Sequence, residues 1–321
     1  MINEVCIIAY NLEHIKLNNN YVINGPGIDL YNFINLLIKN KIKVNLFTQV
    51  NPINIQNGVN YGNIYNSNKV MNSINNSDVV HHWSGIFPIY SEYLKYADSI
   101  DKITLVGPNV IDCVNLESEK IYLKNLNFGK IVTLNNRLRF KISKVHDVTL
   151  DKIDIFRVGP KLEDWQPAKE RSDYILWKGN SKQFVKDIDF ALRIKEKMSK
   201  YKFKFIGYPD TYEYRSHINE AKKAKLYIST SLSETKSNTL LEQWTCGCPS
   251  ITHPKIETHG VNYETGIIVS RDLDSYCEAI EEVMENDNLY KRLSNGCIEY
   301  INKNFNYSKI YNDYLSIIYS I

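Results

Sequence analysis

Long apolar runs are missing from this sequence. Its 321 residues contain no stretch that approaches the roughly 18 apolar residues a membrane-spanning helix needs. A leader peptide is not indicated either, because Met1–Cys6 leads directly into an apolar run, with no basic segment before it and no small-residue cleavage site after it. We therefore expect a chain without a transmembrane segment that resides in the cytoplasm.

A strong charge of one sign is also lacking. The 39 Lys and Arg residues nearly balance the 36 Asp and Glu residues, which leaves a net charge of +3. This is too small to require a nucleic-acid or membrane partner. Cysteines are few and scattered, so we expect reduced, mostly buried thiols rather than disulfides. Cys246 and Cys248 form the one close pair, and we expect them to pack at a helix end and to bind no metal.

Short β-branched runs alternate with longer amphipathic stretches along the chain. This alternation is typical of parallel sheets wound by helical crossovers. The polar stretch Asn57–Asn76 is predicted to be a surface loop with a short helix. The predicted strands are Val5–Tyr10, Lys43–Thr48, Val79–His82, Ile103–Val106, Lys130–Leu134, Ile153–Val158, Tyr174–Trp177, Phe203–Ile206, Leu226–Thr230 and Pro249–Thr252, and helices are predicted at Ile28–Lys39, Asp187–Lys200, Leu273–Asn286 and Ser308–Ile321.

Two such strand–helix series fit the chain, which predicts an α/β fold with two domains. The series meet near Gly159–Pro167, which is rich in turn-forming residues and ends in a proline. We place one Rossmann-like domain at residues 1–160 and a second at residues 161–307, followed by an amphipathic helix at residues 308–321. A dehydrogenase is disfavoured, because no close Gly-x-Gly-x-x-Gly turn follows the first strand.

The strongest chemical signal lies in Ser233–Pro249. A predicted strand ends just before this segment, and Ser237 or Asn238 can cap a new helix that closes at Gly247. A helix that opens beside the carboxyl end of a parallel strand presents free amides and the positive end of its dipole. These groups stabilise a diphosphate.

Two glutamates flank the start of this helix. Glu234 lies in the loop before it and Glu242 lies about one turn inside it. Carboxylates accept hydrogen bonds from neighbouring sugar hydroxyls, so the pair suits a sugar nucleotide. Taken alone, such a pair is more often a solvated helix residue and a partner of the helix dipole.

The whole segment resembles the E-x7-E motif of the large retaining glycosyltransferase family with the GT-B fold, which includes sucrose and mannosyl transferases. The spacing from Glu234 to Glu242 matches, and Leu241–Pro249 looks like the family's LEA-A-x-G-x-P tail. The resemblance implies two Rossmann-like domains whose parallel sheets face each other across a cleft, and a C-terminal helix that returns to the N-terminal domain. It implies that Glu234 contacts the donor sugar, that Glu242 contacts the ribose, and that the diphosphate binds at Lys236, Ser237, Asn238 and Thr239.

The loop after Glu234 departs from the family pattern. The family usually has Gly-Phe-Gly there, and this chain has Thr235-Lys236-Ser237. Without the glycines the backbone approaches a ligand less closely, while Lys236 adds a positive charge. This departure bears on the identity of the donor more than on the class of reaction.

Other stretches resemble the family in the same order along the chain. Lys178 and Lys186 look like its G-R…K-G phosphate clamp, and two cations beside a leaving diphosphate neutralise its developing charge without a metal. Gly25 and Gly27 match its glycine-rich loop on the acceptor side. Residues 259–269 look like a hairpin of the family, and residues 203–229 are shorter than usual, which predicts a missing or compressed strand–helix unit.

Two histidines also fall in a family-like stretch. Asp78–Trp83 resembles the family's D-V-V-H-x-H, with the second histidine one place early. By that resemblance His81 or His82 hydrogen-bonds the donor sugar. A satisfied structural histidine is nearly as common at such a position.

The predicted activity is transfer of a sugar from a nucleotide-diphosphate sugar, first of all a UDP-sugar, to an acceptor hydroxyl. The resemblance implies retention at the anomeric carbon and no metal or other cofactor. We expect an envelope glycan or lipid as acceptor. Two alternatives stay open: a viral enzyme acting on hydroxymethylated pyrimidines in DNA, and a non-catalytic subunit that binds sugar nucleotides. Basic residues within 117–144 could meet an anionic lipid surface or DNA, although such a run is more often merely solvated.

Overall fold

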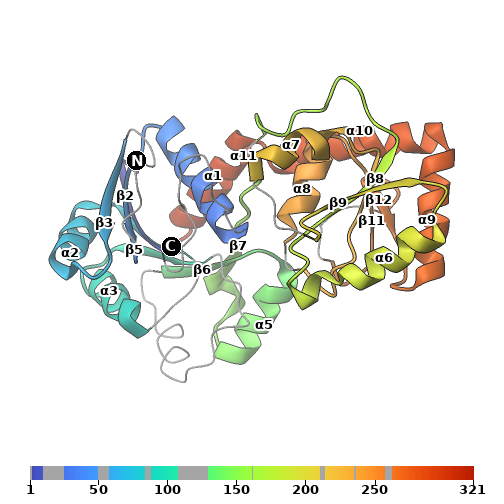
Figure 1. Ribbon diagram of the computed structural model, residues 1–321. Coiled ribbons are helices and arrows are strands. Elements are labelled where there is room, and N and C mark those ends of the chain that lie inside the picture. Colours follow the sequence, from blue (N-terminus) through green and yellow to red (C-terminus); the bar gives the residue numbers. More distant parts are fainter. Residues whose placement is uncertain are drawn as a thin grey trace. The chain divides into compact units, whose positions relative to one another are not determined.

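The computed structural model describes residues 2–9, 25–49, 58–83, 88–107, 129–160, 162–209, 214–234, 236–256 and 262–321 (Figure 1). The chain forms two compact units. Unit 1 contains Met1–Val158 and Tyr307–Ile321, and unit 2 contains Gly159–Asn306. Within the described residues, no helix has the length and apolar character needed to cross a bilayer.

Unit 1 is built on a seven-stranded sheet in the order β3-β2-β1-β4-β5-β6-β7. Every neighbouring pair of strands is parallel, as expected for strands joined by helical crossovers. The strands are β1 (Glu4–Ala9), β2 (Lys43–Thr48), β3 (Val59–Asn63), β4 (Val79–Trp83), β5 (Ile103–Val106), β6 (Gly129–Thr133) and β7 (Ile153–Ile155).

Helices cover both faces of this sheet (Figure 1). Alternate residues of a strand point to opposite faces, so Ile7 joins the core under α1 and α11 while Ile8 joins the core under α2 and α3. The pairing of α1 with α11 places Phe33 and Tyr314 with ring centroids 4.8 Å apart. These helices are α1 (Gly25–Lys39), α2 (Ser67–Asn76), α3 (Pro88–Ser99), α5 (Asn136–His146) and α11 (Tyr307–Tyr319), with the 3-10 turn η2 at Leu150–Lys152.

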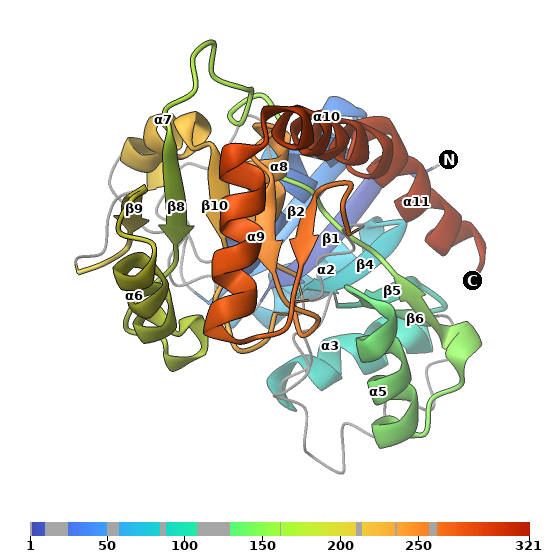
Figure 2. The ribbon, with the colours of Figure 1, turned by 90° about the vertical axis from the view of Figure 1, so that its right-hand side faces the viewer.

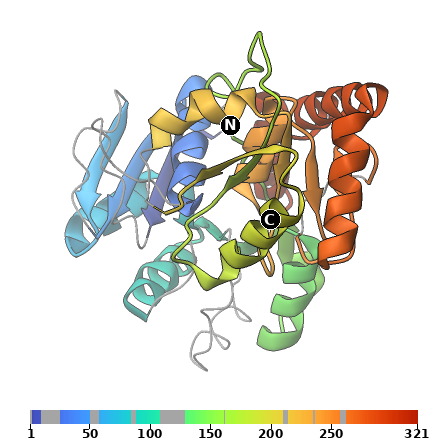
Figure 3. The same cartoon turned by 45° about the vertical axis from the view of Figure 1, so that its right-hand side comes forward.

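Unit 2 has a five-stranded parallel sheet in the order β12-β11-β10-β8-β9. Helices α6 and α9 pack on one face, while α7, α8 and α10 pack on the other (Figures 2 and 3). The strands are β8 (Tyr174–Lys178), β9 (Lys202–Ile206), β10 (Leu226–Ile228), β11 (Ser250–Thr252) and β12 (Gly266–Ile268). The helices are η3 (Phe184–Lys186), α6 (Ile188–Lys197), α7 (Tyr214–Lys223), α8 (Asn238–Thr245), α9 (Leu273–Glu285) and α10 (Asp287–Asn304).

The two parallel Rossmann-like sheets and the C-terminal helix that packs on the first of them confirm the predicted fold class. Two local predictions were wrong. Val59–Asn63 is an edge strand and not part of a loop, because it pairs with β2. Helix α1 begins at Gly25 and not at Ile28. The described part of the predicted hairpin contains the strand β12, which pairs in parallel with β11, and residues 257–261 lie outside the described residues. Between β9 and β10 the described residues contain one helix, α7, so the missing or compressed strand–helix unit stays a prediction.

Candidate functional site

The strand order of unit 2 reverses between β8 and β10, which lie side by side although β9 and α7 separate them in the chain. In open parallel sheets, ligands bind at such a switch point, outside the carboxyl ends of the strands. Lys178 is the last residue of β8, and Thr230 and Ser231 lie two and three residues after the end of β10. The predicted donor-binding residues of unit 2 therefore lie at the edge where this topology binds ligands.

Helix α8 begins at this edge. Ser237 is its N-cap, and the Ser237 hydroxyl accepts a hydrogen bond from the Leu240 amide at 3.4 Å. Asn238 and Thr239 are the first helical residues, and Lys236 is half-buried just before them. The first amides of a helix have no intrahelical partner and carry its positive partial charge, so this end of α8 can bind an anion. Thr235 lies outside the described residues.

Lys178 and Glu242 form a buried ion pair. Their Nζ and Oε2 atoms are 2.7 Å apart, and the side chains are 13% and 3% exposed. Glu242 is therefore not a solvated helix residue, as the pair of glutamates alone would suggest. The ammonium of Lys178 also lies 4.7 Å from the ring centroid of the buried Trp165, at cation–π distance.

Lys186 and Glu234 form a second ion pair at the same edge, with side chains 23% and 16% exposed. The Ser231 hydroxyl donates to Oε1 of Glu234 at 2.9 Å, and the Glu234 amide donates to the Lys255 carbonyl at 3.2 Å. The structure thus places four of the five predicted charged residues of unit 2, all but Lys236, in two lysine–glutamate pairs. A diphosphate could replace the two carboxylates as the partner of the lysine ammonium groups. The carboxylates could then accept hydrogen bonds from sugar hydroxyls.

The backbone around Lys186 is tied to strand β10 by Thr230. The Thr230 hydroxyl oxygen lies 3.0 Å from the carbonyl oxygens of both Lys186 and Asp187. The same oxygen accepts a hydrogen bond from the Trp177 indole at 2.9 Å. Asp187 caps α6 with φ at 44° and forms an ion pair with Arg271. These contacts hold the Lys186 backbone in one place.

The sequence analysis did not identify these supporting residues. Thr230 and Ser231 belong to a run of polar residues that begins at Ser229, directly after a buried strand, and this signal could have marked them. No comparable signal exists for Arg271, because its partner Asp187 lies 84 positions away in the chain and the contact arises only when α6 and α9 pack together.

His253 and the cysteine pair lie close to this site but show structural roles. The His253 ring accepts from the Lys255 amide through Nδ1 at 3.4 Å, so its Nε2 donates to the Ser231 carbonyl at 2.7 Å. Cys246 and Cys248 are free and buried, and burial raises the pKa of each thiol to about 12. Across the described part of the chain, no three His, Cys, Asp or Glu residues gather in a way that could hold a metal ion.

The two predicted histidines lie in unit 1, inside β4. His81 is fully buried, packs against both Phe33 and Tyr314, and has Nε2 2.7 Å from the Gly107 carbonyl, to which it donates. His82 is 1% exposed and points to the opposite face of the sheet. Their predicted contact with the donor sugar stays a prediction, and the structure adds a role for both in the core.

Burial of these histidines makes the stability of unit 1 depend on pH. Desolvation lowers the pKa of His81 from its ordinary 6.5 to about 4, and desolvation together with the nearby His81 lowers that of His82 to about 3. The unfolded chain therefore binds protons from about pH 6.5 downward while the folded chain does not, so stability is present above pH 6.5 and is lost as pH falls. Near pH 5, two such groups give a slope of about 2.7 kcal/mol per pH unit.

Urea titrations at several pH values, read by pulsed hydrogen exchange of the β4 peptide, measure this slope. His82→Asn removes one of the two groups and should halve it. An unchanged slope in the variant would contradict this assignment. So would a wild-type free energy of unfolding that does not change with pH between about 4 and 6.5.

Gly25 and Gly27 lie in the first turn of α1, in unit 1. The neighbouring Asn24 is outside the described residues. The same holds for residues 117–128 of the basic stretch and for residues 257–261 of the predicted hairpin. The proposed role of the two glycines on the acceptor side therefore stays a prediction.

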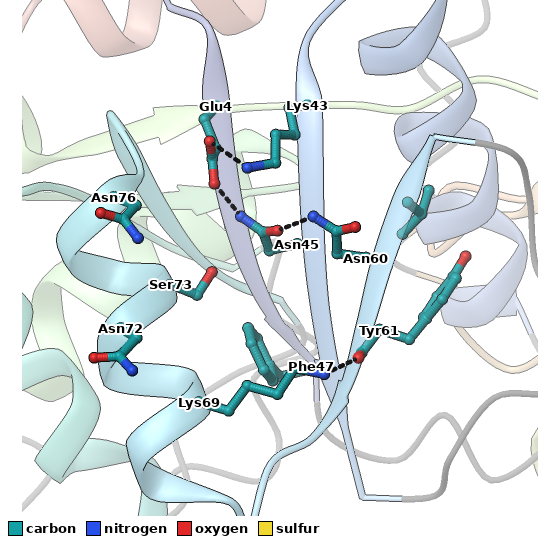
Figure 4. A pocket seen from close by; sticks show the side chains of 11 residues that line it. Glu4, Lys43, Asn45, Phe47, Asn60, Tyr61, Lys69, Asn72, Ser73 and Asn76 are labelled. Atoms are coloured by element: carbon teal, nitrogen blue, oxygen red, sulfur yellow. Dashed lines mark hydrogen bonds and ion pairs between the residues drawn. The ribbon is translucent and has the colours of Figure 1, made fainter.

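A pocket of about 430 Å³ lies in unit 1 between α2 and strands β1–β3 (Figure 4). In it, Lys43 and Asn45 donate to the Glu4 carboxylate at 2.9 and 2.5 Å, and Asn60 donates to Asn45 at 2.8 Å. Glu4 and Lys43 begin their strands, so they mark the edge opposite to the one where open parallel sheets bind ligands. Because it lies at that opposite edge, the pocket is a weaker candidate than the edge of unit 2.

Comparison with solved structures agrees with this architecture. A glycosyltransferase from Rickettsia africae superposes with a TM-score of 0.77 over 99% of this chain and 98% of its own, at 13% identity. The chain has the GT-B fold. Anabaena HepE in complex with UDP gives a TM-score of 0.74 over 99% of this chain and 100% of its own, at 9% identity. Sucrose-phosphate synthase from Thermosynechococcus elongatus gives 0.69 over 98% of both chains, at 12% identity.

The sequence comparisons find no such likeness. No protein-family model matches the chain, and no curated protein matches it in sequence. At 9–13% identity the structural likeness shows the GT-B fold alone, and fold does not by itself determine function. The function must therefore be argued from the edge of unit 2.

Proposed function

We propose that this chain is a retaining glycosyltransferase that moves a sugar from a nucleotide-diphosphate sugar, with UDP as the nucleotide, to an acceptor hydroxyl. The observation that carries the proposal is the pairing of Lys178 with Glu242 and of Lys186 with Glu234 at the switch point of a parallel sheet. The start of α8 lies in the same place. Structures of this fold include one in complex with UDP.

Each group has a chemical task in this proposal. When the bond between the anomeric carbon and the diphosphate oxygen breaks, negative charge develops on the leaving diphosphate. Lys178, Lys186 and the first amides of α8 stabilise that charge without a metal. The acceptor oxygen forms the new bond to the anomeric carbon and its proton passes to the leaving group. Glu234 accepts hydrogen bonds from hydroxyls of the transferred sugar, and Glu242 accepts hydrogen bonds from hydroxyls of the ribose. Retention rests on the family resemblance.

The supporting contacts fit such a site. A catalytic cation must be held in place before the charge develops, because reorganising it during the reaction would cost free energy. The Lys186 backbone is held by Thr230 and Glu234 is held by Ser231. We propose an envelope glycan or lipid as acceptor.

Thermal-shift measurements with UDP-, GDP- and TDP-sugars test the donor. A ligand at about 100 times its dissociation constant stabilises the fold by about 2.7 kcal/mol, which corresponds to a rise of roughly 5–10 °C in the melting temperature of a unit this size. We expect the rise with a UDP-sugar and release of UDP when an acceptor is added. The matched control is Lys200→Met, which removes a lysine of an exposed ion pair in the same unit.

The same experiment separates the alternatives. Absence of any shift with all three donor classes would reject the proposal. A shift without UDP release in the presence of glycan, lipid and DNA acceptors would favour a non-catalytic subunit that binds sugar nucleotides.

A further inference from the structure

The sheet face of unit 1 that packs against α2 changes character along its strands. Toward the carboxyl ends of β1 and β2, Ile8 and Phe47 join the core under α2 and α3. Nearer the amino ends, the same face carries Glu4, Asn45 and Asn60 on three neighbouring strands (Figure 4). Sheet faces that helices cover in such folds are normally apolar, so this polar patch calls for an explanation other than packing.

Helix α2 turns a polar stripe toward the patch. Its apolar residues Val70 and Ile74 pack in the core. The residues that it contributes to the pocket repeat at the i, i+3, i+4, i+7 spacing of one helix face. They are Lys69, Asn72, Ser73 and Asn76. The pocket of about 430 Å³ therefore has polar side chains on both the sheet and the helix, and its volume is in the range of small-molecule sites.

The floor of the pocket is a chain of hydrogen bonds that fixes its polar groups. The Asn45 amide donates to one oxygen of Glu4 at 2.5 Å and accepts from Asn60 at 2.8 Å. Lys43 donates to the other Glu4 oxygen at 2.9 Å. Each amide can form up to four hydrogen bonds and a carboxylate about four. The exposed Asn60 and the half-buried Glu4 can therefore bind a ligand while the network keeps them oriented.

We propose that this pocket binds a neutral saccharide. The Glu4 carboxylate in its floor repels a phosphate or another anion, and the ammonium groups of Lys43 and Lys69 repel a cation. A sugar hydroxyl both donates and accepts, as an asparagine amide does, so neighbouring hydroxyls match the oriented amides. The inference concerns unit 1 and does not depend on the proposed function.

A nucleobase fits the pocket less well, because it needs an aromatic ring to stack on. Phe47 is 2% exposed, and its ring covers Gly62, where an added Cβ would lie 2.3 Å from a ring carbon. The Tyr61 ring packs with the core on the opposite face of the sheet. Neither aromatic residue of the pocket therefore offers a ring face, whereas a saccharide can be held by hydrogen bonds alone.

Saturation-transfer difference NMR with glucose, galactose, mannose and N-acetylglucosamine tests the inference. We expect at least one of them to bind with a dissociation constant of about 1 mM, as suits a sugar-sized ligand in an open polar pocket. Asn60→Leu should weaken that binding about tenfold, because it removes both a donor and an acceptor. Asn72→Leu changes the helix wall and gives the same test if Asn60→Leu does not fold.

The matched control is Asn68→Leu. Asn68 is an exposed asparagine of the same helix that does not line the pocket, so this variant should bind sugar as the wild type does. Binding of none of the four sugars below about 20 mM would overturn the inference, and so would a sugar affinity that the pocket variant leaves unchanged. Binding of inorganic phosphate that depends on Asn60, without sugar binding, would do the same.

The outcome can be separated from the fate of the proposed function. Saturating UDP should leave the sugar affinity unchanged, because the proposed donor residues lie in unit 2. Circular dichroism shows whether each variant is folded, and the pocket variants should retain the thermal shift with a UDP-sugar. Loss of sugar binding with an intact donor shift therefore reports on the pocket alone, and a missing donor shift in the wild type reports on the proposed function alone.

Discussion

Lys186→Met should reduce the rate of sugar transfer by about 100- to 1,000-fold, the usual loss when one group that stabilises transition-state charge is removed. The loss should appear mainly in kcat, because the charge of the diphosphate grows as the bond to the sugar breaks. Glu234→Gln keeps the shape of its side chain but removes the charge that it presents to sugar hydroxyls. We expect about 10- to 100-fold from this change, the value of one hydrogen bond to a charged group.

UDP release and product formation, measured over a range of donor concentrations, give these values. The exposed Lys200→Met variant is the control and should react at the wild-type rate. Stability should change by no more than about 1 kcal/mol in the Lys186 and Glu234 variants, because their ion pair is partly solvated. Rates within a factor of three of the wild type for Lys186→Met would rule out the assigned role.

The Lys178–Glu242 pair should behave differently, because it is nearly buried. Lys178→Met leaves the Glu242 carboxylate buried without its cation, and Glu242→Met leaves the Lys178 ammonium group without its carboxylate. Each single change should lower the free energy of unfolding of unit 2 by about 3–5 kcal/mol. The double variant, with Met at both positions, replaces the pair by apolar side chains and should recover most of the loss.

This cycle separates stability from binding. The double variant should be folded at ordinary temperature and yet show no thermal shift with a UDP-sugar, because both donor contacts are gone. Urea titrations of the four proteins give the coupling energy. Single variants that each cost less than about 1 kcal/mol would mean that the pair is solvated in the protein, and a donor shift retained by the double variant would remove both residues from the proposed site.

Much of the fold followed from local signals. The buried runs Lys43–Thr48 and Ile103–Val106 became strands with the predicted bounds, because β-branched and apolar residues suit a strand covered on both faces. Val59–Asn63 was missed since its sequence, VNYGN, lacks such a run. It is a strand only because β2 offers it a ladder of backbone partners at the sheet edge.

The candidate site was predictable where it follows a short motif. Glu234, Ser237 and Glu242 lie within one loop and helix, so their spacing carries the information. The pairing of Lys178 with Glu242 spans 64 positions, and the sequence placed the two lysines only through a family resemblance. Contacts such as Arg271 with Asp187 depend on how helices pack, and no local pattern encodes them.

The route of the chain through the two units orders their assembly during synthesis. Unit 2 is one continuous segment, Gly159–Asn306, whereas unit 1 needs both the first half of the chain and the last helix. The apolar face that α11 covers, including His81 and Phe33, is complete only when Tyr314 has left the ribosome. Because domains fold as units once their sequence is available, the nascent chain can finish its second unit while its first still waits for Tyr307–Ile321.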